Sequence, residues 1–112
     1  MHLKEKFLTY LEAYAEKNIQ KVADCFAEDI RLRDWKISVV GKDAALMETQ
    51  KNFSAASAIE IEVLSLYESQ NGIAGELKIT VDCTEILYVV DVLTFDERGQ
   101  VDSIHAYIGR AD

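Results

Sequence analysis

The sequence predicts an α+β domain in which helices pack on a strongly curved antiparallel sheet, with a mixed edge, and enclose a pocket. Apolar residues recur every three to four positions in the first third of the chain and every second position beyond about residue 57. The 112 residues suit one hydrophobic core, and no linker, repeat or proline divides them. We therefore expect a single domain over residues 1–112, with the helices on one face of the sheet.

Three helices are expected, over residues 3–16, 18–28 and 43–53. The apolar stripe of the first consists of Phe7, Tyr10, Leu11 and Tyr14, spaced i, i+3, i+4 and i+7. Asn18 is the expected N-cap of the second helix. The third should begin after Gly41, with Asp43 as its N-cap.

Strands make up the rest of the predicted domain. Alternation places Ile30, Leu32 and Asp34 on one face of a short strand, with the arginines between them on the other. Four more strands are expected at 59–63, 73–81, 85–95 and 101–108. The Asn71-Gly72 pair and the segment 96–99 provide turns between them.

The charge of the chain excludes some classes of partner. It carries 12 basic and 20 acidic residues, a net charge of −8, so phosphate backbones and anionic lipid surfaces should repel it. Arg31 and Arg33 are two charges rather than a basic stripe. We expect neither nucleic acid nor a membrane as a partner.

The expected location is the cytoplasm. Residues 1–6 include an early acidic residue, Glu5, and lack the apolar core of a signal peptide, and no apolar run approaches the roughly 20 residues of a membrane span. Cys25 and Cys83 lie far apart without a metal-binding spacing, so we expect two buried free thiols and no metal site.

Three segments resemble one superfamily. Residues 26–34 resemble the helix-to-strand junction of nuclear transport factor 2-like proteins, and residues 41–45 the glycine that leads into their third helix. Residues 89–101 resemble their closing strand, turn and strand. The resemblance implies a cone-shaped α+β barrel around a pocket, and it is greatest to the ketosteroid isomerase and SnoaL-like branch.

That branch implies a candidate active site. Its isomerases carry a tyrosine on the first helix, an aspartate that ends the first strand and a second aspartate on a late strand. Tyr10, Asp34 and Asp91 match these positions, with Asp34 following Tyr10 by 24 residues. The resemblance implies that Asp34 is the general base and that Tyr10 and a protonated Asp91 stabilise the enolate oxygen. It also implies chemistry without a cofactor, a small apolar ligand and a homodimer formed through the sheet.

The residue types suit that chemistry, but each has a plainer interpretation. The apolar neighbours of Asp91 on its strand should raise its pKa and keep it protonated, unless backbone amides or a basic side chain hold it ionised. Tyr10 fits core packing equally well. Asp34 could instead accept hydrogen bonds in a turn or pair with an arginine.

Further residues are expected to line the pocket. They are Tyr14, Trp35, Val89, Leu93, Ile104 and Ile108. His105 alternates with the inward positions and should face the outer surface of the sheet.

The sequence also departs from the isomerases. Trp35 stands where they commonly have proline, and Gln50 where some place a tyrosine that supports the first one. Two functions therefore stay open: a cofactor-free enzyme that isomerises a small apolar carbonyl compound, and a non-catalytic ligand-binding or protein-interaction domain of the same fold. A third, a cyclase or epoxide hydrolase, would need other polar groups in the pocket, which the sequence does not locate.

Overall fold

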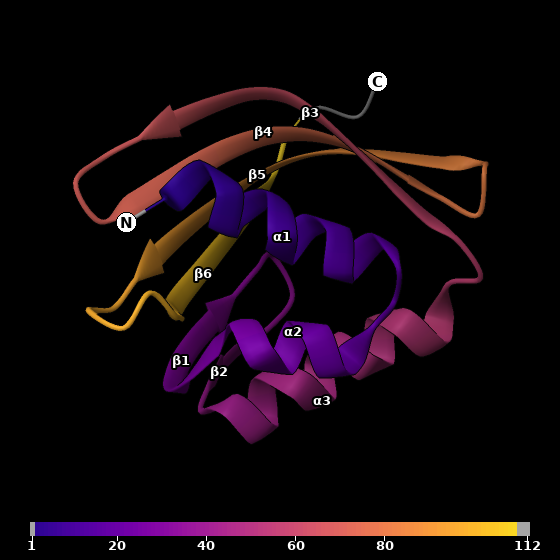
Figure 1. Ribbon diagram of the computed structural model, residues 1–112. Coiled ribbons are helices and arrows are strands. Elements are labelled where there is room, and N and C mark those ends of the chain that lie inside the picture. Colours follow the sequence, from indigo (N-terminus) through magenta and orange to yellow (C-terminus); the bar gives the residue numbers. More distant parts are fainter. Residues whose placement is uncertain (1, 110–112) are drawn as a thin grey trace.

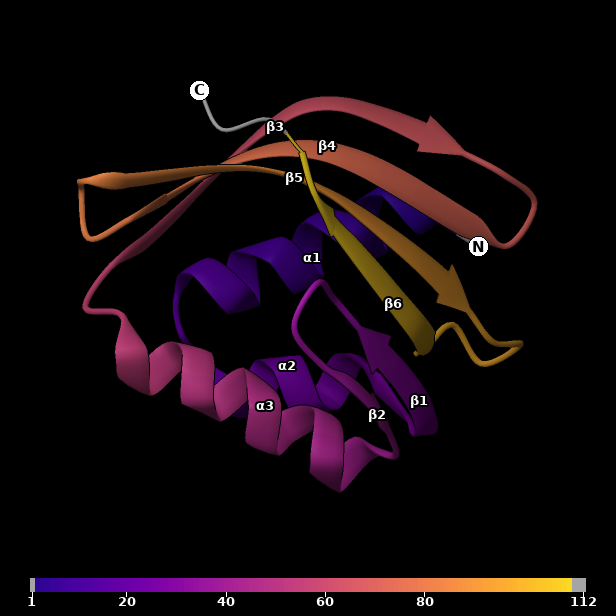
Figure 2. The same cartoon turned by 180° about the vertical axis from the view of Figure 1, so that it is seen from behind.

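Three helices cover one face of a curved, six-stranded sheet (Figure 1). The computed structural model describes residues 2–109. The helices are α1 (Leu3–Ala15), α2 (Ile19–Cys25) and α3 (Lys42–Ala55). The view from behind shows the sheet arching over α1, with α2 and α3 below (Figure 2). The α+β fold predicted from the sequence is confirmed.

The helix ends follow local chemistry, and two of them differ from prediction. The Asn18 side chain caps α2 by accepting a hydrogen bond from the Lys21 amide at 3.1 Å, as predicted. Helix α2 ends at Cys25 rather than near residue 28, because Phe26 already adopts extended backbone and packs in the core. The N-cap of α3 is Gly41, whose φ of +101° suits glycine, and not Asp43, which lies in the first turn.

The sheet is open and its strands lie in the order β2-β1-β6-β5-β4-β3. Their bounds are β1 Phe26–Arg33, β2 Ser38–Val40, β3 Ile59–Glu68, β4 Gly72–Val81, β5 Glu85–Phe95 and β6 Val101–Ile108. Every pair is antiparallel except β1 with β6, which run parallel near one edge. The short β2 was not predicted.

Irregular pairing bends the sheet. The register shifts between Val63 and Ser65 on β3, and between Phe26 and Arg31 on β1. Such bulges increase local twist and curvature. The curved sheet can therefore close on the helices at one end while standing away from them at the other.

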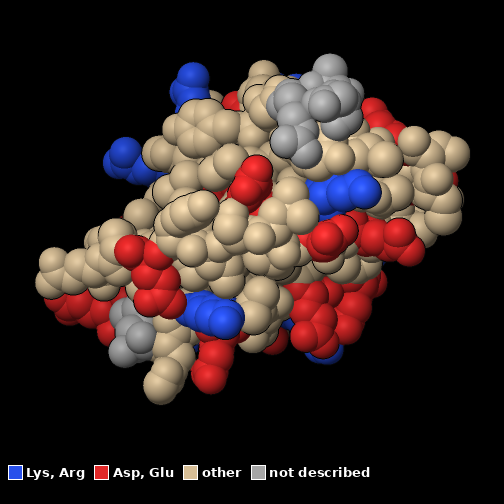
Figure 3. Space-filling model, turned by 90° about the horizontal axis from the view of Figure 1, so that it is seen from above, with Lys and Arg blue, Asp and Glu red and all other residues tan. Residues whose placement is uncertain are grey.

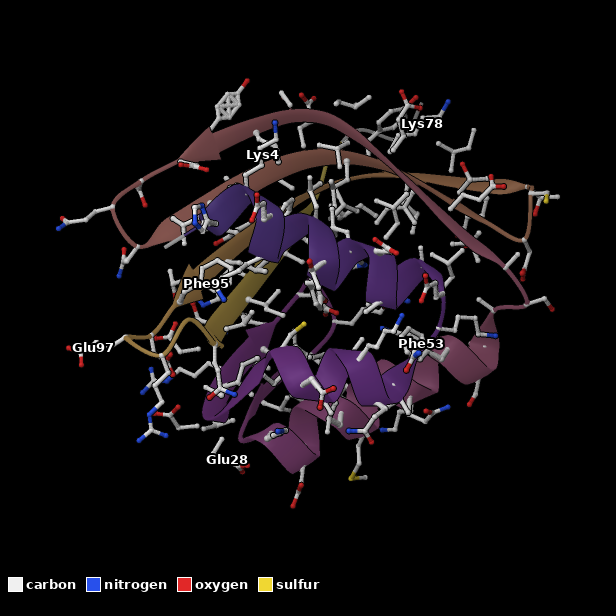
Figure 4. All side chains as sticks on the ribbon, in the orientation of Figure 1. Lys4, Glu28, Phe53, Lys78, Phe95 and Glu97 are labelled. Carbon is white, nitrogen blue, oxygen red and sulfur yellow. The ribbon has the colours of Figure 1, made fainter. Side chains whose placement is uncertain are left out.

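The closed end is filled with buried apolar side chains. Phe7 of α1 and Leu93 of β5 are fully buried, and Phe95 is nearly so. A Cβ atom on Gly75 would lie 2.5 Å from the Phe7 ring, so the ring needs glycine beneath it. Figure 4 shows Phe95 towards this end and Phe53 of α3 towards the other.

The outer face of the sheet is mixed in character. Seen from above, residues other than Lys, Arg, Asp and Glu make up most of this face, with charged side chains scattered over it (Figure 3). Tyr67, Ile86 and Tyr107 are exposed.

Cys83 is exposed, contrary to prediction, because it lies in the tight β4–β5 turn with a φ of +63°. Cys25 is half-buried, and both thiols are free. No helix among residues 2–109 is long and apolar enough to cross a membrane.

Candidate active site

A cavity of about 410 Å³ occupies the open end, between α1, α3 and the inner face of the sheet. Its wall is mostly apolar, with ionisable side chains from several elements. Tyr10 and Tyr14 of α1, Asp34 after β1 and Asp91 of β5 line it, and so do Lys36, Glu48, Lys51 and Glu85. Residues far apart in the sequence therefore meet at one cavity.

Six residues were expected to line this space, and four do. Tyr14, Trp35, Val89 and Ile104 contribute to the wall. Leu93 does not, because it lies towards the closed end and is fully buried in the core. Ile108 does not either: β6 extends beyond its last pairing with β1, at His105, and leaves Ile108 43% exposed beside a separate hollow.

Asp91 lies in the middle of β5, where its neighbours leave room around it. In the sheet it is flanked by Gly75 on β4 and Ala106 on β6. It is only 9% exposed, and within residues 2–109 its carboxyl has no hydrogen-bond or ion-pair partner. Burial first, and then the charge of Asp34, raise the pKa of Asp91 to about 7. Near neutral pH this carboxyl is therefore protonated in a large fraction of molecules.

Tyr10 reaches the cavity from α1. Its side chain is 5% exposed and its ring lies against Phe26, with 6.1 Å between centroids. Burial, followed by the charge of Asp91, raises the pKa of Tyr10 well above its ordinary value. The hydroxyl thus remains a hydrogen-bond donor at any physiological pH.

Asp34 follows the last residue of β1 and is half-buried at the rim. Its Oδ1 accepts hydrogen bonds from the backbone amides of Lys36, at 2.7 Å, and Ile37, at 2.9 Å. This turn fixes the carboxylate, and among the described residues Oδ2 has no hydrogen bond and no arginine pairs with it. Asp34 is therefore a turn acceptor through one oxygen while the other stays free.

The sequence and the fold match known proteins. Residues 7–105 match the SnoaL-like domain family. The chain belongs to that family. It is 28% identical over 106 residues to a steroid Δ-isomerase from Nocardioides simplex, an alignment that covers 92% of this chain and 86% of that protein.

Solved structures agree on the fold. An epoxide hydrolase/cyclase-like enzyme of pyran ring formation in salinomycin superposes with a TM-score of 0.83 at 22% identity, covering 97% of this chain and 92% of that one. A nuclear transport factor 2-like protein of unknown function from Cytophaga hutchinsonii gives 0.80 at 13% identity, covering 97% and 93%. The nuclear transport factor 2-like fold that the resemblance implied is thus confirmed.

This SnoaL-like domain contains a polar pair that the sequence did not indicate. Asn52 of α3 donates a hydrogen bond from Nδ2 to the Tyr14 hydroxyl at 3.0 Å, and both residues line the cavity. Gln50 is exposed and bonds to Ser54 instead. The available signal was helical spacing, because Asn52 lies three residues after the buried Thr49 and so shares its face.

Trp35 separates the cavity from the second hollow at the rim. It is 42% exposed and lines both spaces. The second hollow, of about 280 Å³, is bounded by Arg33 and by His105, which is exposed as expected. Within residues 2–109 no group of three or more His, Cys, Asp or Glu side chains is placed to hold a metal ion.

Proposed function

We propose that this SnoaL-like domain is a cofactor-free enzyme that isomerises a small, largely apolar unsaturated carbonyl compound by acid–base chemistry. The observation that carries the proposal is Asp91, an unpartnered carboxyl in the wall of a cavity that also presents the Tyr10 hydroxyl and the Asp34 carboxylate. Buried carboxyls without partners are rare outside functional sites, because burial penalises their charged form.

The roles follow from the state of each group. Asp34, held in its turn with Oδ2 free, removes a proton from the carbon between the carbonyl and the double bond. The negative charge moves to the carbonyl oxygen, where the Tyr10 hydroxyl and a protonated Asp91 donate hydrogen bonds. Asp34 then returns the proton to the far carbon of the former double bond. The net result is a conjugated isomer, with no change in atoms or oxidation state.

The size of the cavity limits the substrate. At about 410 Å³ it lies towards the lower end of the range of roughly 300–1,000 Å³ typical of small-molecule sites. The relative from Nocardioides simplex is a steroid Δ-isomerase by name. Here we favour a smaller carbonyl compound, or one that projects past Trp35 at the rim.

The test is turnover of β,γ-unsaturated ketones of increasing size, followed through the ultraviolet absorbance of the conjugated product. We expect turnover by the natural sequence and its loss in Asp34→Asn. Asp24→Asn is the control, because Asp24 is an exposed carboxyl outside the cavity. Proton NMR decides the rival function: a domain that binds the ketone without converting it to the conjugated isomer is a binding domain and not an isomerase.

We also propose that two copies associate through the outer face of the sheet. The outward positions of β5 are Ile86, Tyr88, Val90 and Val92, an apolar row that exposed Tyr107 extends on β6. Sedimentation velocity should give a dimer that Val90→Glu dissociates, since each copy already carries a net charge of −8. An unchanged dimer in that variant would assign the contact to another surface.

Finally, we place the protein in the cytoplasm. Cys83 is both exposed and free, and such thiols persist in reducing compartments. Fractionation of cells that express the chain tests this placement.

A further inference from the structure

Ring contacts from two helices hold the Tyr14 side chain in position at the wall of the cavity. It lies one helical turn after Tyr10 on α1, with 6.0 Å between their ring centroids. The edge of the Phe53 ring from α3 packs against the Tyr14 ring at a centroid distance of 5.0 Å. Packing from two helices therefore sets the position of the phenol group.

A hydrogen bond then sets the direction of its proton. Asn52 donates from Nδ2 to the Tyr14 hydroxyl oxygen, so this oxygen is the acceptor. The hydroxyl hydrogen must point away from Asn52, and within residues 2–109 the structure gives it no acceptor. Because Tyr14 lines the cavity, a ligand in that space can accept a hydrogen bond from this free donor. Accepting one hydrogen bond also makes a hydroxyl a stronger donor.

The charges around Tyr14 keep that proton in place. Burial raises the pKa of its hydroxyl, the bond from Asn52 opposes that rise, and the charges of Asp91 and Asp34 add to it. The net direction is upward, so Tyr14 is neutral when both carboxyls are ionised. Tyr14 is thus within electrostatic reach of the base and of the other proposed donor.

We propose that Tyr14 is a second tyrosine donor to the ligand's anionic oxygen and that Asn52 is the residue that positions it. The inference rests on the proposed function for its placement in a reaction. A site with this additional tyrosine donor should bind a planar oxyanion, such as a phenolate, more tightly than the neutral ketone.

Binding of 4-nitrophenol tests the proposal without turnover, because its absorbance distinguishes phenol from phenolate. We expect the protein to bind the phenolate form, and Tyr14→Phe to weaken that binding by about tenfold or more, the usual loss for a hydrogen bond to a charged group. Gln50→Ala is the matched control, since Gln50 lies on the same helix and bonds only to Ser54. Undiminished phenolate binding by Tyr14→Phe would overturn the proposal.

A double-mutant cycle tests the role of Asn52. Asn52→Ala should weaken phenolate binding in the natural background and have no further effect in the Tyr14→Phe background. It should also raise the pKa of Tyr14, seen in the tyrosinate absorbance that Tyr14→Phe removes. Equal weakening in both backgrounds would show that Asn52 does not act through Tyr14.

The two proposals fail separately. Loss of phenolate binding in Tyr14→Phe, together with no turnover of any ketone, would retain the donor and reject the isomerase. Turnover that depends on Asp34 but is unaffected in Tyr14→Phe, with phenolate binding also unaffected, would retain the isomerase and reject the donor. Thermal unfolding of each variant, which should match the natural sequence within a few degrees, separates both outcomes from loss of folding.

Discussion

The two ends of the space between the helices and the sheet use the same elements, α1 and β5, yet one is filled and the other hollow. At the filled end, Phe7 lies over Gly75 and Leu93 is fully buried. At the hollow end, Tyr10 and Asp91 face a cavity. The contrast follows from the polar atoms that the side chains carry at the hollow end and lack at the filled end. A phenyl ring loses nothing when protein surrounds it, whereas unpartnered hydroxyl and carboxyl groups need water or a ligand.

The boundary between the two ends is sharp. Gly75 lies beside Asp91 in the sheet, and the same glycine receives the Phe7 ring. Within this one residue pair, Gly75 of β4 contacts the packed core and Asp91 of β5 forms part of the cavity wall.

The largest expected effect comes from emptying the filled end. Phe7→Ala should lower the free energy of unfolding by about 3–5 kcal/mol, because it removes a fully buried ring from close packing. Val89→Ala at the cavity wall should cost at most about 2 kcal/mol, since its side chain already borders open space. Urea denaturation of both variants measures the difference. Equal losses would show that the cavity wall is packed as tightly as the core.

The next effect concerns pH and Asp91. Its pKa is raised from 3.8 unfolded to about 7 folded, so the folded state binds this proton more tightly. Its contribution to stability is therefore present below pH 4, declines as the pH rises from 4 to 7, and is constant above that range. The total decline is on the order of 4 kcal/mol.

The comparison variant is Asp91→Asn, which keeps the shape and removes the titration. Urea denaturation from pH 4 to pH 8 should show the stability of the natural sequence falling relative to that of the variant. Parallel curves for the two proteins would mean that Asp91 titrates normally and stays ionised. It would then be no donor at neutral pH.

Sequence periodicity predicted most helices and strands because the signal for each one comes from residues that are close together in the sequence. Apolar spacing located α1, β4, β5 and β6, and the Asn18 cap depends on contacts within a few residues. The short β2 carries no periodic signal, and its pairing with β1 depends on the turn that Asp34 closes. Helix α2 was predicted too long because Phe26 continues its apolar stripe while its backbone is already extended.

The site was predictable for residues on which the family resemblance and the alternation of the strands agreed. It was less predictable for residues whose place in the cavity or the core depends on how the elements pack. Tyr10, Asp34 and Asp91 line one cavity, although their roles remain predictions. Leu93 shares its strand face with Asp91, and alternation cannot tell a filled end from a hollow one. Asn52 was missed because it lies 38 residues from Tyr14 in the sequence, and their hydrogen bond forms only when α1 and α3 pack in the fold.

The smallest expected effect separates two roles of Asp34 at the rim of the hollow end. Asparagine also has a side-chain oxygen that can accept from the Lys36 and Ile37 amides, so Asp34→Asn should keep the turn and change stability by less than about 0.5 kcal/mol. Asp34→Ala removes both hydrogen bonds and should cost about 1 kcal/mol, a modest loss because water can replace them at a half-exposed site.

Loss of turnover should not parallel loss of stability in Asp34→Asn and Asp34→Ala. Neither substituent can accept the substrate proton, so both variants should be inactive although only one is destabilised. Urea denaturation and the enone assay, carried out on the same preparations, check the two quantities together. If Asp34→Asn retained activity while Asp34→Ala lost it, the carboxylate would matter only for the turn, and the base would have to be sought elsewhere in the cavity.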